Sequence, residues 1–177
     1  MKSSAKNDFV MPIAVLTIIC LVITALLALT NSATEPVITK AAAERAEAAR
    51  TEIIPEAEGF ELMEVDGLPS TVKEAYSTTN DCGYIFMLET MGYGGEMDLI
   101  LGMDNDGEII AVKTLAHSET KGMGSKTAEE PFRSQFTGKD ESLEGVSAIS
   151  GATISSKAYL GAVADAFAAF NLVTGVE

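Results

Sequence analysis

Residues 83–115 read GYIFMLETMGYGGEMDLILGMDNDGEIIAVKTL, and this stretch decides the fold of the chain. Residues 84–90 are apolar and aromatic, apolar side chains recur at every second position over 97–103, and a further apolar run, 108–115, follows the turn sequence DNDG. A period of two is typical of strands, and an Asp-Gly pair favours a tight turn between antiparallel strands. The stretch therefore predicts an antiparallel meander of strands.

Helical patterns lie on either side of this meander. Residues 34–50 are rich in Ala and Glu, which favour helix, and Pro36 lies near the start of that segment. Pro131 and Phe132, followed by Phe136, indicate a short helix. Residues 155–171 predict a last helix, whose core-facing stripe is Leu160, Val163, Ala164, Phe167 and Phe170. We expect an α+β fold: an antiparallel sheet packed by helices and preceded by one N-terminal transmembrane helix.

The N-terminal region contains an uncharged apolar run, residues 9–29, which is long enough to cross a bilayer as a helix. A secretory signal peptide is the alternative, but the run is longer than the usual signal core, which favours a retained anchor. Lys2 and Lys6 outweigh Asp8 before the run, so we expect the N-terminus in the cytoplasm. The predicted organisation at the cell (inner) membrane is a cytoplasmic segment 1–8, a transmembrane helix 9–29, a spacer helix and linker 30–55, and an extracytoplasmic domain 56–177.

The composition of the chain limits the kinds of partner and metal that it can bind. The chain has 12 basic and 26 acidic residues; two and one of these precede residue 33, so the remainder carries 10 against 25 and a formal charge of −15. This charge argues against nucleic acid as a partner, because phosphate backbones require a basic surface. Cys20 lies in the apolar run and Cys82 in the domain, and two cysteines with one histidine leave no ligand set for an iron–sulfur cluster or zinc. Asp104 and Asp106 lack the further ligands of a calcium loop, so no metal site is expected.

A short motif near the C-terminus carries the main indication of function. Residues 150–156 read SGATISS and lead directly into the last predicted helix. Small residues let the backbone approach a ligand, the hydroxyl groups supply donors, and the unpaired N–H groups of a helix N-terminus favour an anion such as phosphate. The alternative is an ordinary N-cap, because serine and threonine are preferred there.

A second polar segment, residues 117–124, reads HSETKGMG and follows a predicted strand. Together the two segments resemble the FMN-binding domain shared by the G-subunit of Rnf-type ferredoxin:NAD oxidoreductase complexes and the C-subunit of sodium-pumping NADH:quinone reductases. In that family the first loop usually reads H-x-E-T-P-G-x-G and the second D-x-x-S-G-A-T-x-[ST]-S. The resemblance extends over the membrane anchor and over residues 92–110, GYGGEMDLILGMDNDGEII.

The resemblance implies that FMN is held covalently through a phosphoester bond to Thr153. It also implies that a separate flavinyltransferase uses FAD as the donor, and that this chain is the substrate of that enzyme. The other cofactor-binding residues that we expect are Ser150, Gly151, Ala152, Ser155, Ser156, Glu119, Thr120, Gly122 and Gly124. No residue is expected to be catalytic, and His117 is interpreted as holding the loop in preference to relaying protons.

The chain departs from the family pattern at two positions. Ser147 stands where the attachment signature most often has an acidic residue, and Lys121 stands where the first loop usually has proline. The first departure concerns recognition by the modifying enzyme, and the second leaves the loop less rigid because proline would restrict one backbone dihedral. Neither removes the hydroxyl group of Thr153.

These observations predict a membrane-anchored electron-transfer subunit that carries FMN within an ion-translocating Rnf-type complex, alongside the other membrane subunits and the lipid bilayer. A flavin subunit of a sodium-pumping NADH:quinone reductase is one alternative. The other is an extracytoplasmic module that binds a phosphate-containing ligand reversibly or assists assembly, with no redox role.

Overall fold

The computed structural model describes residues 4–175, with side chains from Val10 onward. Lys2 and the side chain of Lys6 therefore lie outside the described residues. The prediction that the N-terminus is cytoplasmic depends on these two charges. The chain divides into two units, residues 1–44 and residues 45–177, and we describe each by itself.

The first unit is helical and forms most of α1 (Ser4–Ile53). Its apolar side chains are exposed, and the most apolar stretch has a mean hydropathy of 2.8 with the length and composition of a membrane span. The hydroxyl group of Thr17 donates a hydrogen bond to the carbonyl of Ile13 at 2.8 Å, which satisfies a polar group within the apolar run. The expected separate spacer helix is not observed as such, because α1 continues without a break through Pro36.

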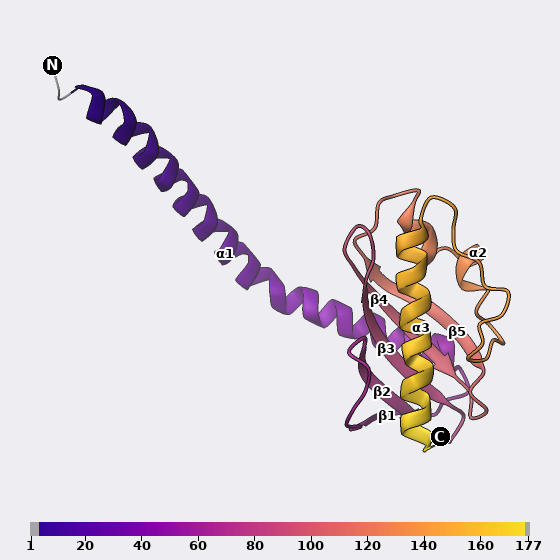
Figure 1. Ribbon diagram of the computed structural model, residues 1–177. Coiled ribbons are helices and arrows are strands. Elements are labelled where there is room, and N and C mark those ends of the chain that lie inside the picture. The colour runs from indigo at the N-terminus through magenta and orange to yellow at the C-terminus, as the bar shows by residue number, and fades with distance from the viewer. Residues whose placement is uncertain (1–3, 176–177) are drawn as a thin grey trace. The chain divides into compact units, whose positions relative to one another are not determined.

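The second unit is an antiparallel sheet with helices (Figure 1), as the sequence predicted. Five strands follow chain order across the sheet: β1 (Phe60–Met63), β2 (Val72–Thr78), β3 (Tyr84–Met91), β4 (Glu96–Met103) and β5 (Ile109–His117). The three predicted strands are β3, β4 and β5, whereas the sequence pattern did not reveal β1 and β2. The remaining elements are the 3₁₀ helix η1 (Gly124–Ala128), α2 (Glu130–Arg133) and α3 (Thr153–Thr174).

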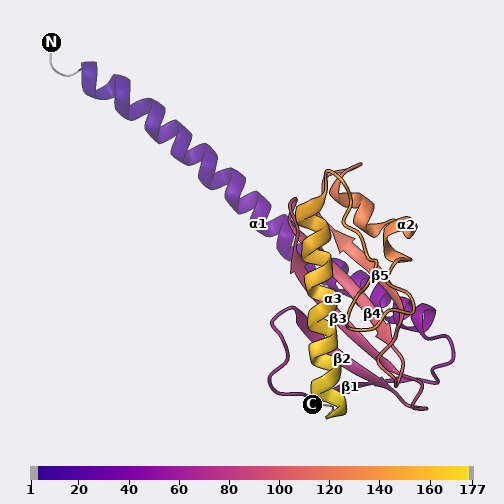
Figure 2. The same cartoon turned by 45° about the vertical axis from the view of Figure 1, so that its right-hand side comes forward.

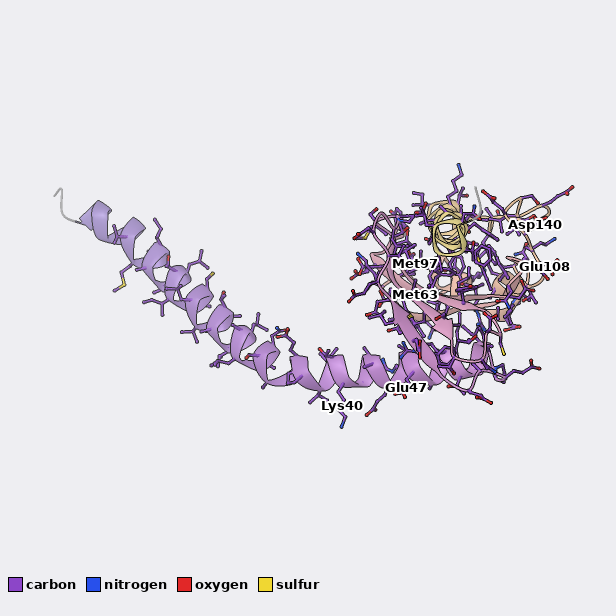
Figure 3. All side chains as sticks on the ribbon, turned by 90° about the horizontal axis from the view of Figure 1, so that it is seen from below. Lys40, Glu47, Met63, Met97, Glu108 and Asp140 are labelled. Carbon is purple, nitrogen blue, oxygen red and sulfur yellow. The ribbon has the colours of Figure 1, made fainter. Side chains whose placement is uncertain are left out.

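The main core lies between α3 and one face of the sheet, as Figures 1 and 2 show. Alternate residues of β4, including Met97 and Leu99, are fully buried on this face, and Figure 3 shows Met97 on the side that carries α3. Phe132 and Phe136 are both buried, and each ring contacts the ring of Tyr159 on α3. The predicted stripe of α3 is confirmed except at Ala164, which is exposed.

The opposite face of the sheet has its own smaller core. Ala49 and Ile53, from the last turns of α1, pack with Ile54 against Ile85 and Ile100. These α1 residues belong to the second unit, so the end of this helix forms part of the folded domain. The sheet is therefore covered on both faces, and strands β3 and β4 carry apolar residues toward each of them.

Candidate functional site

Strand directions bring the two sequence motifs to the same edge of the sheet. Strands β3 and β5 both pair antiparallel with β4, so they run in the same direction and their following loops leave the sheet at one edge. Helix α3 also begins there. A pocket of about 490 Å³ lies between these segments, within the roughly 300–1,000 Å³ typical of small-molecule sites. It is lined by Tyr93, Glu119, Thr120, Met123, Gly124, Gly151, Ala152, Thr153, Ile154 and Ser155.

The N-terminus of α3 forms one wall of this pocket. Ala152 occupies the N-cap position, and among the described residues no side chain caps the first turn. The N-cap interpretation of the serine and threonine cluster is therefore wrong for this helix. Thr153 is the first helical residue, lines the pocket and is exposed. Gly151 has φ = +84°, a left-handed conformation suited to glycine, and it brings the chain into the helix beside the pocket.

The serines of the motif have different environments. Ser156 is fully buried, and its Oγ accepts a hydrogen bond from the backbone N–H of Ile149 at 3.0 Å, which ties the approaching loop to the helix. Ser155 lines the pocket and is also buried, but its Oγ has no hydrogen-bond partner among the described residues. A buried hydroxyl group without a partner is costly, so Ser155 offers a polar contact to a ligand.

Glu119 is a buried carboxylate at the base of the first loop, with 8% of its surface exposed. Its Oε1 accepts a hydrogen bond from the backbone N–H of Gly94 at 3.2 Å, while Oε2 is buried with no partner among the described residues. The backbone N–H of Glu119 donates to Nδ1 of exposed His117 at 3.2 Å. His117 therefore contributes to the shape of the loop, as the interpretation of its sequence position expected.

The remaining predicted residues lie around the pocket without lining it. Gly122, Ser150 and Ser156 are not among the lining residues. Both residues that depart from the family pattern, Lys121 and Ser147, are exposed and outside the pocket as well.

Three lining residues were not identified from the sequence as ligand contacts: Tyr93, Met123 and Ile154. All three side chains are more than half exposed. Tyr93 is followed by two glycines, a pattern typical of a tight turn, and no local pattern distinguishes an exposed apolar residue beside a pocket from one elsewhere on the surface. The glycines on either side of Tyr93 were the one feature of the sequence that could have indicated a ligand contact there.

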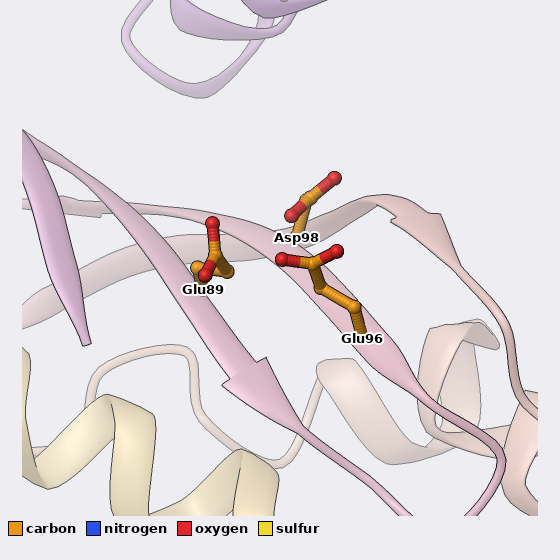
Figure 4. Close-up of side chains that lie close together, drawn as sticks. All are labelled: Glu89, Glu96 and Asp98. Atoms are coloured by element: carbon orange, nitrogen blue, oxygen red, sulfur yellow. The ribbon is translucent and has the colours of Figure 1, made fainter. Parts of the chain in front are cut away.

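A second polar feature lies outside the pocket. The carboxylates of Glu89, Glu96 and Asp98 have oxygen atoms within 4.8 Å of one another (Figure 4). Lys73 forms an ion pair with Glu89 at 3.0 Å and lowers the pKa of that carboxyl group, whereas a hydrogen bond with Glu89 raises the pKa of Glu96. Burial, and then the charge of Glu89, raise the pKa of Asp98. The cluster is thus a site of charge repulsion that one lysine partly offsets.

We predict that Asp98→Asn stabilises the protein at neutral pH. Asp98 faces Glu89 directly across the two strands, and like charges in such opposite positions destabilise a strand pair. A raised pKa means that the folded state binds the proton more tightly, so the ionised form of Asp98 weakens the fold as pH rises. The gain should therefore be present at pH 7 and vanish below about pH 4, where Asp98 is protonated in both the folded and the unfolded state.

Urea unfolding of the full-length chain in detergent, followed by circular dichroism, measures this difference. The parent and the Asp98→Asn variant are compared at several pH values. Equal free energies of unfolding at pH 7 would show that solvent screens the repulsion completely.

The geometry of the pocket suits a ligand with an anionic end and an aromatic end. The uncapped N-terminus of α3 attracts an anion, and apolar side chains line the pocket as well. Two buried oxygen atoms, on Ser155 and Glu119, lack partners in the part of the chain that the structure describes. The side chains present therefore fit a flavin mononucleotide. Residues 92–168 match the FMN-binding domain family, a segment that begins at the β3–β4 turn and includes every lining residue. The second unit is accordingly an FMN-binding domain.

Relatives that match over most of the chain identify the family. The chain is 33% identical over 175 residues to the G-subunit of the ion-translocating oxidoreductase complex of Methanosarcina acetivorans, covering 90% of this chain and 93% of the relative. It is 30% identical over 172 residues to the G-subunit of the Na⁺-translocating ferredoxin:NAD⁺ oxidoreductase complex of Acetobacterium woodii, covering 81% and 83%. The chain belongs to the G-subunit family of ion-translocating oxidoreductase complexes, which confirms the resemblance seen in its sequence.

A third relative matches over a shorter range. The G-subunit of the proton-translocating ferredoxin:NAD⁺ oxidoreductase complex of Clostridium ljungdahlii is 33% identical over 102 residues, which cover 52% of this chain and 55% of the relative. With the apolar helix α1, this family membership indicates a membrane-anchored subunit of a multi-subunit oxidoreductase complex.

Proposed function

We propose that this chain carries FMN covalently on Thr153 and passes electrons within an Rnf-type complex that couples electron transfer between ferredoxin and NAD to ion translocation. The observation that carries the proposal is the position of Thr153. Its hydroxyl group belongs to the first residue of an uncapped helix and lines a pocket in which two oxygen atoms have no partner within the described part of the chain. The names of the relatives from Clostridium and Acetobacterium favour ferredoxin and NAD over quinone as the reaction partners.

Attachment requires a flavinyltransferase with FAD as the donor. Thr153 Oγ1 forms a bond to the phosphorus on the riboflavin side of the FAD diphosphate, the P–O bond of the anhydride breaks, and AMP leaves with the displaced oxygen. The hydroxyl proton passes to solvent. Thr153 is exposed at a loop–helix boundary, which gives a second enzyme access to this atom.

The residues around Thr153 hold the cofactor after attachment. Backbone N–H groups in the first turn of α3 offset the phosphodiester charge, because the positive end of the helix dipole lies there. Ser155 and Glu119 provide hydrogen-bonding groups inside the pocket. Bound there, FMN supplies one- and two-electron redox chemistry, while the protein supplies its position and surroundings. A covalent bond retains the cofactor on a surface outside the cytoplasm, where a lost flavin would not be recaptured.

Expression of the full-length chain with and without a flavinyltransferase tests the proposal. A flavin-fluorescent band that survives denaturing electrophoresis, with the corresponding increase in intact mass, is expected only when the transferase is present. Peptide mapping should place the added mass on Thr153. A chain that stays unmodified with an active transferase would favour the non-redox module that binds a phosphate-containing ligand reversibly.

We also propose that residues 56–177 lie outside the cytoplasm, with α1 anchoring the chain in the bilayer beside the other membrane subunits. A thiol engineered at Asp140, which is exposed, should react with an impermeant maleimide added to intact cells, whereas one at Ser4 should react only after lysis. The parent gives the background labelling, because it contains Cys20 within the apolar run and the partly exposed Cys82 in the domain. Labelling at Ser4 and not at Asp140 in intact cells would reverse the orientation.

The charge of Glu119 should lower the redox potential of a flavin in the pocket. Glu119→Gln keeps the shape and the acceptor for the Gly94 N–H but removes the charge. At an effective dielectric constant of about 20, one charge some 8–16 Å away contributes about 1–2 kcal/mol. We expect the two-electron potential to rise by about 20–45 mV. Redox titration of the loaded parent and variant measures the shift, with Glu141→Gln, which removes the charge of an exposed side chain outside the pocket, as the comparison. Equal potentials in the parent and Glu119→Gln would contradict a charged Glu119 near the ring.

A further inference from the structure

The turn between β3 and β4, Gly92–Gly95, contributes an aromatic side chain to the pocket. Tyr93 lines the pocket and is 73% exposed, the largest exposed fraction among the large apolar side chains that the structure describes. The turn itself is closed by a hydrogen bond from the N–H of Gly92 to the carbonyl of Gly95 at 2.8 Å. An aromatic ring that remains this exposed at the rim of a pocket leaves a large apolar surface for a ligand to cover.

Glu119 fastens this turn to the loop that follows β5. Its Oε1 accepts the hydrogen bond from Gly94, and the adjacent N–H of Ser118 donates to the carbonyl of Glu96 at 3.0 Å. The contact is so close that glycine is required: a Cβ atom at Gly92 would lie 1.9 Å from Oε1 of Glu119, and one at Gly94 would lie 2.6 Å from the carbonyl oxygen of Ser118. The turn and the loop therefore form one packed unit, which determines where Tyr93 lies.

The pocket has a polar part and an apolar part. The polar part includes the side-chain oxygen atoms of Thr153, Ser155 and Glu119, two of which have no hydrogen-bond partner among the described residues. The apolar part consists of Tyr93, Met123 and Ile154, all largely exposed and drawn from three different segments. FMN has the same division, because its phosphate and ribityl chain are polar whereas its isoalloxazine ring is flat and aromatic.

We infer that Tyr93, Met123 and Ile154 form the subsite for the isoalloxazine ring, that the ring of Tyr93 contacts the flavin, and that Glu119 is the positioning residue for Tyr93. The inference rests on the proposed attachment at Thr153. Planar aromatic pairs attract each other beyond the area that they bury, so Tyr93 contributes to holding a ring that the covalent bond alone would leave free to move.

Flavin fluorescence of the loaded, full-length protein tests this contact. Tyrosine in contact with an excited flavin quenches its fluorescence by donating an electron that then returns, whereas phenylalanine and leucine do not. Native Tyr93→Phe and Tyr93→Leu should therefore be several-fold brighter than the native parent, with loss of the short-lived fluorescence component. All three proteins should be equally bright after denaturation, because the amount of attached flavin is unchanged. Tyr93→Leu alone should also shift the visible absorption band, since Tyr93→Phe keeps the aromatic surface.

The positioning role of Glu119 has its own pair of variants. Glu119→Ala removes the acceptor for Gly94 and should release the turn, so the native protein should brighten toward the level of Tyr93→Phe. Glu119→Gln retains an acceptor oxygen and should restore the quenching of the parent. Quenching that persists in Glu119→Ala would overturn the positioning role.

The outcomes separate this inference from the proposed function. Native fluorescence and lifetimes that are the same in the parent and both Tyr93 variants, with covalent flavin present in all three, would overturn the Tyr93 contact and leave attachment at Thr153 standing. A parent that lacks covalent flavin in the presence of an active transferase would overturn both proposals.

Discussion

Replacing Thr153 with valine is expected to abolish the covalent retention of flavin. Valine keeps the branched shape but has no hydroxyl group, so no oxygen atom remains at this position to bond to phosphorus. Thr153 is exposed, and its side chain does not cap the helix, so the free energy of unfolding should change by no more than about 0.5 kcal/mol. Denaturing electrophoresis with flavin fluorescence should show no band, while circular dichroism matches the parent.

Two neighbouring serines provide matched controls for this experiment. Ser150→Ala removes an exposed hydroxyl group just before the helix, and Ser155→Ala removes a buried one two residues after Thr153. Both variants should retain the fluorescent band if Thr153 is the acceptor. A Thr153→Val protein that still carries covalent flavin on Ser150 or Ser155 would refute the assignment.

Replacing Gly124 with alanine is expected to disrupt the pocket from within. A Cβ atom at this position would lie 1.8 Å from Oε2 of Glu119 and 2.9 Å from Oγ of Ser155, both of which are buried. Both side chains would have to move, and inserting a methyl group into such a packed site costs about 1–3 kcal/mol. Thermal unfolding should show the loss of stability, and the displaced Glu119 should reduce the quenching of flavin fluorescence in the native state.

Gly161→Ala is the matched control for this substitution. Gly161 is exposed within α3, and no atom of the described residues other than its own neighbours lies within 4 Å of the position that its Cβ would occupy. Alanine in the middle of a helix should therefore stabilise the protein by roughly 0.5–1 kcal/mol. If Gly124→Ala proves as stable as the parent, the packing of Glu119 against Gly124 is not as described.

The strands differed in how readily their sequence revealed them. Apolar side chains recur at every second position over residues 97–103, because one face of β4 packs against α3. The sequence also predicted the strands on either side of it, β3 and β5. Strand β2 reads VKEAYST and β1 only FELM, and neither presents an apolar alternation that separates a strand from a loop. Their strand conformation depends on pairing: β1 pairs with β2, and β2 with β3. Cross-strand contacts of this kind stabilise a sheet but leave little trace in local sequence.

The candidate site, like the sheet, could be predicted from the sequence only in part. The two motifs that contain Glu119 and Thr153 were recognised from their residues, and the pocket brings them together. The sequence did not indicate that Glu119 would be buried with a partner in the β3–β4 turn, or that Tyr93 would lie in the pocket. These relationships join residues about 25 positions apart, and the intervening strands decide whether they meet.

The sequence by itself determined the apolar N-terminal helix, the meander of β3 to β5, the last helix and the two motifs, because each depends on residue type and short-range periodicity. Only the tertiary structure decided which serine hydroxyl group forms a hydrogen bond within the protein. Ser156 accepts one from the backbone N–H of Ile149, whereas Ser155 lines the pocket without a partner among the described residues. The tertiary structure also decided that α3 begins without a side-chain cap and that three glycines surround Glu119. The physical reason is that burial and hydrogen bonding of these groups depend on atoms contributed by distant segments, which come together only when the sheet forms and α3 packs across it.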